Sequence, residues 1–74
     1  MRDPNRLDSF YDTMKIIHKT CFPDWRFGQL MMNFLGWVQT EKQDPFFPED
    51  SVMIEYLKEY CQTYAPLTFA KINL

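Results

Sequence analysis

Residues 23–40, PDWRFGQLMMNFLGWVQT, decide the fold class of this 74-residue chain. Apolar side chains recur in this stretch at three- and four-residue steps, which is the period of a helix with one buried face. They are Phe27, Leu30, Met31, Phe34, Leu35 and Val38. Asp24 follows Pro23 and suits the N-cap position. We therefore predict an amphipathic helix over about residues 25–39.

Two glycines lie within this predicted helix. Gly28 and Gly36 each cost roughly 1 kcal/mol relative to alanine in a helix interior. Either they let a neighbouring backbone approach closely, or the packed face tolerates them. Gly36 is also a residue at which the helix could end early.

The same periodicity occurs on both sides of this stretch. The earlier stripe predicts a helix over about residues 4–21, with Asp3 as N-cap and Pro4 in its first turn. Its members are Leu7, Phe10, Tyr11, Met14, Ile17, His18 and Cys21. The later stripe predicts a helix over about residues 48–64, with Pro48 in its first turn. Its members are Met53, Tyr56, Leu57, Tyr60, Cys61 and Tyr64.

Proline residues separate the three predicted helices and mark their ends. Pro23 ends the first, because the residue before a proline is pushed out of helical geometry, and Pro66 stops the third. The expected fold is all-α: a compact three-helix bundle in one domain, residues 1–66, followed by a short extended C-terminal tail, residues 67–74.

Composition excludes several classes of function. Eight basic and ten acidic residues give a net charge of −2 with no basic stripe, which argues against nucleic acid as a partner. Apolar runs are far shorter than the ~20 residues that span a bilayer, so no membrane partner is expected. Residues 1–25 lack the pattern of a signal peptide, and we expect a cytoplasmic protein with reduced cysteines.

His18, Cys21 and Cys61 are the residues from which a metal site or a Cys–His pair could be built. A structural zinc site needs four ligands, and the chain has one His and two Cys. A nucleophilic thiolate needs an electropositive, partly exposed setting, whereas both cysteines lie on apolar stripes. A Cys21–Cys61 disulfide is conceivable, but a reducing compartment favours free thiols. We expect no catalytic residue, no metal and no cofactor.

Side chains that do not fit the core indicate a contact surface. Arg26, Gln29, Asn33, Trp37 and Thr40 fall within an arc of about 80° away from the apolar stripe, and we call them the polar ridge. Aromatic and arginine side chains are enriched in binding hot spots. The other interpretations are that Arg26 and Asn33 form an internal network, and that Trp37 covers the edge of the bundle.

Two further positions are secondary candidates for partner binding. Ile16 projects opposite the buried arc of the first helix, among polar neighbours. Phe46 lies with Phe47 between two prolines, where we expect one of the two rings to pack on the third helix as a staple. Seven Phe, four Tyr and two Trp are more than a core of this size hides, so aromatic surface should remain.

Three blocks of sequence resemble a family. RDPNRL at residues 2–7, PDWRFGQL at residues 23–30 with Asn33, and FPED at residues 47–50 are similar to short bacterial and phage-borne helical proteins, and distantly to the small YihD-like proteins of unknown function. The resemblance implies a helical fold and brings no catalytic residues with it. It raises the possibility of a phage protein that acts on a host protein.

The sequence thus favours a non-enzymatic protein–protein interaction module that can self-associate. The predicted partner-binding residues are Arg26, Gln29, Asn33, Trp37, Ile16 and Phe46. The alternatives are a small-ligand or nucleotide-binding regulator that uses Arg26 and the polar ridge, a structural homodimer, and a phage-type inhibitor of a host protein.

Overall fold

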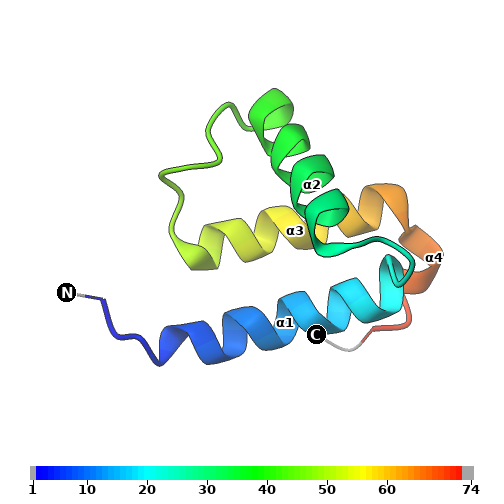
Figure 1. The fold of residues 1–74 in the computed structure, drawn as a ribbon, viewed down its shortest axis with the longest axis horizontal. Helices are drawn as coiled ribbons and strands as arrows, with labels where there is room; N and C mark the ends of the chain where they lie inside the picture. Colours follow the sequence, from blue (N-terminus) through cyan, green and yellow to red (C-terminus); the bar gives the residue numbers. More distant parts are fainter. Residues whose placement is uncertain (1, 73–74) are drawn as a thin grey trace.

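The fold is three packed helices and one helical turn. The computed structural model describes residues 2–72 and contains α1 (Arg6–Cys21), α2 (Phe27–Glu41), α3 (Asp50–Tyr64) and α4 (Pro66–Phe69). Figure 1 shows α1 and α3 side by side and running in the same direction, with α2 lying across α3. The short α4 contacts both α1 and α3. The prediction of an all-α three-helix bundle is confirmed.

The first and third helices begin two residues later than predicted. Asp3 Oδ1 accepts the N–H of Asn5 at 3.0 Å, which is the hydrogen bond expected of an N-cap, but residues 3–5 form a turn and the α-helix itself begins at Arg6. Pro48 does not start α3, because Glu49 is extended and the helix begins at Asp50. Side-chain hydrogen bonds of this kind set a boundary that periodicity alone does not mark.

The second helix is shifted toward the C-terminus relative to the prediction. Asp24 is not its N-cap, since Arg26 is the last extended residue and its N–H donates to Gln29 Oε1 at 2.7 Å. Gly36 does not end it, because α2 continues to Glu41. A Cβ added at Gly28 or Gly36 would meet no atom of the described chain within 4 Å. Close approach of a neighbouring backbone within the described chain is therefore not the reason for these glycines.

The predicted extended tail is wrong over its first residues. Pro66 occupies the first position of α4, where its missing N–H costs nothing, and Phe69 packs against the core. Residues 73 and 74 of the predicted tail lie outside the described residues.

The core lies where α2 packs on α3. Its buried side chains come from both of these helices and from the end of α1: Ile17, Phe22, Leu30, Phe34, Val38, Leu57, Tyr60 and Cys61. Only Ile17 of the first predicted stripe is fully buried, and Tyr11 is 57 % exposed. The periodicity overstates the burial of α1, because the core is centred where α2 packs on α3 and only the C-terminal part of α1 contributes to it.

Ion pairs join the starting ends of α1 and α3. Arg2 contacts Glu49, and Arg6 Nε donates to Asp50 Oδ2 at 2.7 Å. The hydrogen bond from Arg2 lowers the pKa of the Glu49 carboxyl. Exposed pairs of this kind contribute little stability each, and both link the start of α1 to the start of α3.

Candidate partner-binding surface

The polar ridge lies on the outer face of α2. Arg26, Gln29 and Asn33 are exposed, and Trp37 is half-buried. Within residues 2–72, neither the Arg26 guanidinium nor the Asn33 amide has an ion-pair or hydrogen-bond partner. These two groups thus form no internal network within the described residues, and both are available to a partner.

Trp37 both covers the edge of the bundle and reaches the surface. Its ring lies 6.4 Å from that of Phe34 and 5.5 Å from that of Tyr60, between ring centroids. On another side, Lys42 Nζ lies 5.8 Å from the indole. The hydrogen bond between Lys42 and Glu59 raises the pKa of the Lys42 ammonium, which keeps this cation charged. These contacts fix the orientation of Trp37 before any partner binds.

Two open hollows flank Asn33 on this face. The first hollow has a volume of about 550 Å³. Its lining residues are Arg26, Gly28, Gln29, Met32 and Asn33. The second hollow has a volume of about 390 Å³. Its lining residues are Asn33, Gly36, Trp37, Thr40, Glu41, Tyr60 and Tyr64. The structure thus joins four of the predicted residues, Arg26, Gln29, Asn33 and Trp37, into one surface.

Sequence reasoning missed Met32, Tyr64 and Glu41 as members of this surface. Met32 is 78 % exposed, and its position off the apolar stripe of α2 is a signal that could have found it. The periodicity places Tyr64 in the core stripe of α3, but it is the last residue of that helix and is 59 % exposed beside Tyr60. Its place next to Trp37 depends on how α2 crosses α3, which the sequence does not show.

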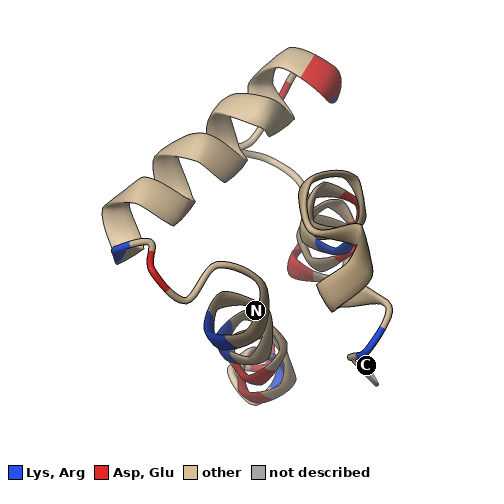
Figure 2. Cartoon of the chain, turned by 90° about the vertical axis from the view of Figure 1, so that its right-hand side faces the viewer, with Lys and Arg blue, Asp and Glu red and all other residues tan. Residues whose placement is uncertain are grey.

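The outer face of α2 carries no charge along its length. No acidic or basic residue occurs from Phe27 to Thr40, whereas Arg26 precedes the helix and Glu41 ends it. Figure 2 shows this as an uncoloured helix with charged residues near its two ends only, unlike α1 and α3. The cores of protein–protein interfaces are similarly depleted of charged residues.

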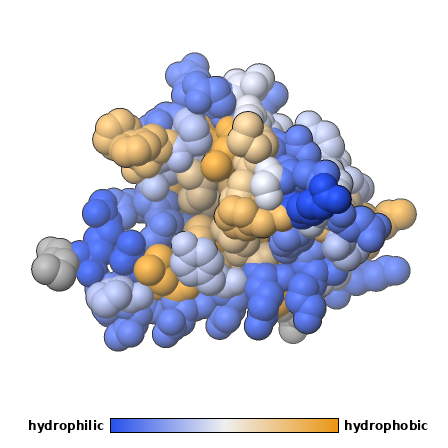
Figure 3. Space-filling view, viewed as in Figure 1, coloured by the Kyte–Doolittle hydropathy of each residue, from blue (hydrophilic) through white to orange (hydrophobic). Residues whose placement is uncertain are grey.

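Ile16 and Phe46 do not belong to this surface. Neither lines either hollow. Phe46 and Phe47 are 82 % and 79 % exposed, and their rings contact each other edge to face at 4.9 Å. The predicted staple is therefore wrong for both rings. Figure 3 shows hydrophobic surface at the upper left, where the 42–49 connection of Figure 1 projects, and separately at the centre of the view.

The residues considered for metal or thiol chemistry have structural surroundings. His18 Nε2 lies 2.7 Å from the backbone oxygen of Trp25, which ties α1 to the turn before α2. Cys21 and Cys61 are free, and burial raises the pKa of both thiols, that of Cys61 to about 12. Such thiols hold little thiolate at neutral pH. Within residues 2–72, no three His, Cys, Asp or Glu side chains are placed to hold a metal ion.

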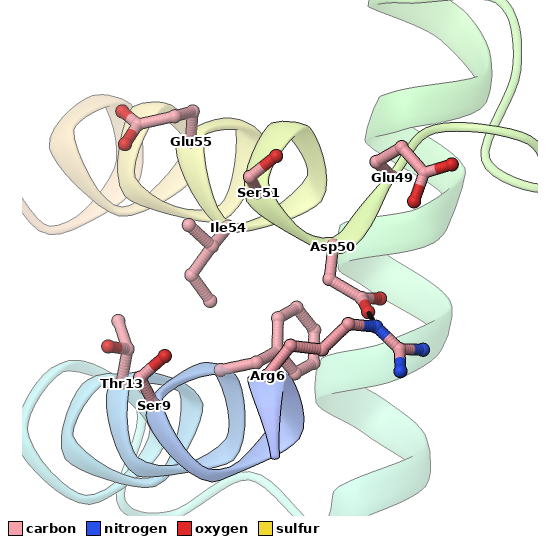
Figure 4. A pocket seen from close by; sticks show the side chains of 9 residues that line it. Arg6, Ser9, Thr13, Glu49, Asp50, Ser51, Ile54 and Glu55 are labelled. Atoms are coloured by element: carbon pink, nitrogen blue, oxygen red, sulfur yellow. Dashed lines mark hydrogen bonds and ion pairs between the residues drawn. The ribbon is translucent and has the colours of Figure 1, made fainter. Parts of the chain in front are cut away.

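A separate groove lies between the starting ends of α1 and α3 (Figure 4). It has a volume of about 440 Å³ and an apolar floor that includes Ile54, with the hydroxyls of Ser9 and Thr13 along the α1 side. Arg6 closes one end, where its guanidinium is held by Asp50. The groove offers more hydrogen-bond acceptors than free cations.

Comparison with known proteins finds no family model, no curated relative and no solved structure that matches this chain. The resemblance of its three sequence blocks to YihD-like and phage-borne proteins therefore stays a prediction. None of the described helices has the length and apolar character needed to cross a membrane.

Proposed function

We propose that this protein is a non-enzymatic protein–protein interaction module that binds its partner through the outer face of α2. The observation that carries the proposal is the surface around Asn33, where a fixed tryptophan, an unpaired arginine and an exposed methionine border two adjoining hollows. Such side chains, set in or beside pockets at the centre of a patch, are typical of binding hot spots.

Rigidity and low charge favour binding at this face. Trp37 is already ordered by Phe34 and Tyr60, so binding does not have to immobilise it. The uncharged stretch from Phe27 to Thr40 can be desolvated without burying unpaired charge. Arg26 lies at the end of the stretch, where a rim position suits a charged side chain.

A phage-type inhibitor of a host protein is a special case of the same proposal, in which the partner is the host protein. The two free thiols are in keeping with a reducing compartment, so a cytoplasmic location remains part of the proposal.

The test is affinity capture with three immobilised proteins: wild type, Asn33→Arg and Thr20→Arg. Asn33 and Thr20 are both exposed, so neither substitution removes a core contact, and both add one positive charge. Trp37→Ala is a poorer probe, because it also removes the contacts with Phe34 and Tyr60. We expect a bound protein that wild type and Thr20→Arg retain and Asn33→Arg loses. Identical sets of bound proteins on all three would contradict the proposal.

A small-ligand regulator is the second candidate function, and the groove of Figure 4 favours it over the polar ridge. The two hollows on α2 are open, and Arg26 is the one basic residue that lines them, which is a poor match for a nucleotide's phosphates. The groove combines an apolar floor with hydroxyl and carboxylate groups, which suits a small amine or alcohol. A ligand screen in which none raises the melting temperature would count against this candidate.

A further inference from the structure

We propose that the partner of this surface is a second copy of the same chain, and that the two α2 helices pack antiparallel about a two-fold axis beside Asn33. This inference rests on the proposed function, since it uses the same face. It adds the identity of the partner and the orientation of the two helices.

The first argument comes from the charges at the ends of α2. Arg26 stands at the start of the helix, where the helix dipole is positive, and Glu41 stands at its end, where the dipole is negative. Each charge therefore interacts unfavourably with the dipole of its own helix. Neither has an ion-pair partner within residues 2–72. An antiparallel copy of α2 reverses this, because each Arg26 then lies by the C-terminal end of the neighbouring helix.

The spacing of the two charges fits a two-fold axis. The midpoint between Arg26 and Glu41 falls between Asn33 and Phe34, and each charge lies about 11 Å along the helix from it. Rotation about an axis at that midpoint brings each Arg26 opposite the other copy's Glu41. A parallel arrangement would instead place like charges together, so the charges select the antiparallel one.

The centre of the face is complementary to itself in shape and charge. The protruding Met32 and the exposed Gly36 lie on opposite sides of the midpoint, so antiparallel packing places Met32 of one copy toward Gly36 of the other. The absence of charge from Phe27 to Thr40 means that two identical faces meet without repulsion.

The size of the contact predicts a weak, reversible dimer. A 15-residue helix is about 22 Å long, so one helix pair buries less than the roughly 1,600 Å² of a standard stable interface. Association should therefore become visible between about 1 µM and 1 mM, and the measurements must cover this range.

Sedimentation equilibrium over this range tests the arrangement by charge exchange. The five proteins are wild type, Arg26→Glu, Glu41→Arg, the double variant R26E/E41R, and Lys15→Glu. The last is a control that repeats the charge change of Arg26→Glu at an exposed residue of α1. The proposed dimer contains two Arg26–Glu41 pairs, and each single exchange puts like charges in both of them. We therefore expect the dissociation constant of the dimer to rise at least about tenfold. The double variant should restore the wild-type constant within about threefold, and the control should match wild type.

Loss of dimer in the single variants cannot be ascribed to unfolding. Each exchange puts the charge that the helix dipole favours at that end of α2, so the monomers should remain folded by circular dichroism.

A wild type that is monomeric up to about 1 mM would overturn the inference, as would a dimer whose constant the double variant does not restore. The proposed function is tested independently of this self-pairing. If wild type is monomeric yet captures another protein that Asn33→Arg loses, the surface binds a different partner and only the self-pairing is wrong.

Discussion

Replacing Gly36 by alanine should stabilise the monomer. Gly36 lies in the interior of α2 with an ordinary helical backbone, and a Cβ at this position meets nothing within 4 Å. Alanine is favoured over glycine in a helix interior by about 1 kcal/mol, largely because it restricts the unfolded chain. For a domain of this size, about 1 kcal/mol corresponds to a rise of roughly 4–8 °C in the melting temperature.

Thermal unfolding followed by circular dichroism measures this gain. The protein concentration should be about 0.5 µM, below the range of about 1 µM to 1 mM in which a small interface associates. Gly28→Ala is the matched control, since its Cβ also meets nothing within 4 Å but Gly28 is the second residue of the helix. Intrahelical hydrogen bonding is incomplete in the first turn, so the gain there should be smaller.

An unchanged or lower melting temperature for Gly36→Ala would refute this reasoning. It would mean that another group fills the space above Gly36, or that α2 is not a regular helix at this residue. In either case the outer face of α2 would not be open as described.

Three further predictions concern the core, the thiols and an ion pair. Phe34→Ala removes a ring that is 1 % exposed and should cost about 3–5 kcal/mol in urea unfolding, enough to leave the domain marginally folded. In native protein at pH 7, iodoacetamide should label Cys21 slowly and buried Cys61 only after unfolding, which mass spectrometry of the peptides distinguishes. Arg2→Ala should lower the melting temperature by more at pH 7 than at pH 3. Because the pKa of Glu49 is lower in the folded state, the stabilisation is present above about pH 4.5 and is lost as pH falls.

Each of these predictions has a control or a result that contradicts it. Phe46→Ala removes a ring that is exposed, so its unfolding free energy should change by about 0.5 kcal/mol or less. Equal labelling rates at Cys21 and Cys61 in native protein would show that Cys61 is not buried. An effect of Arg2→Ala that is the same at pH 3 and pH 7 would mean that its cause is not the pair with Glu49.

The helices could be predicted from the sequence because apolar spacing and prolines determine them directly. The stripe through Leu30, Phe34 and Val38 became the buried face of α2, and Pro23 and Pro66 lie just beyond the ends of α1 and α3. The starting residues could not be predicted as well. They depend on local capping hydrogen bonds, such as those that the side chains of Asp3 and Gln29 accept from backbone N–H groups.

The candidate surface was partly predictable for a similar reason. One helix wheel is enough to group Arg26, Asn33 and Trp37 on one arc, and the structure places them on one face. The hollow beside Trp37 needs Tyr64 from α3, and the crossing of two helices depends on packing over the whole core. The sequence could not show that Phe46 lies apart from this surface, because nothing in the neighbouring residues indicates that the 42–49 connection projects away from the bundle.

Photo-crosslinking tests most directly whether α2 is the contact surface. Benzoylphenylalanine is introduced either at Met32, which is exposed on α2, or at Tyr11, which is exposed on α1, and the protein is irradiated in cell extract and alone at high concentration. The proposal predicts a cross-linked product, with a second copy or with another protein, from position 32 and none from position 11. Products from position 11 with none from position 32 would contradict the assignment of the surface to α2.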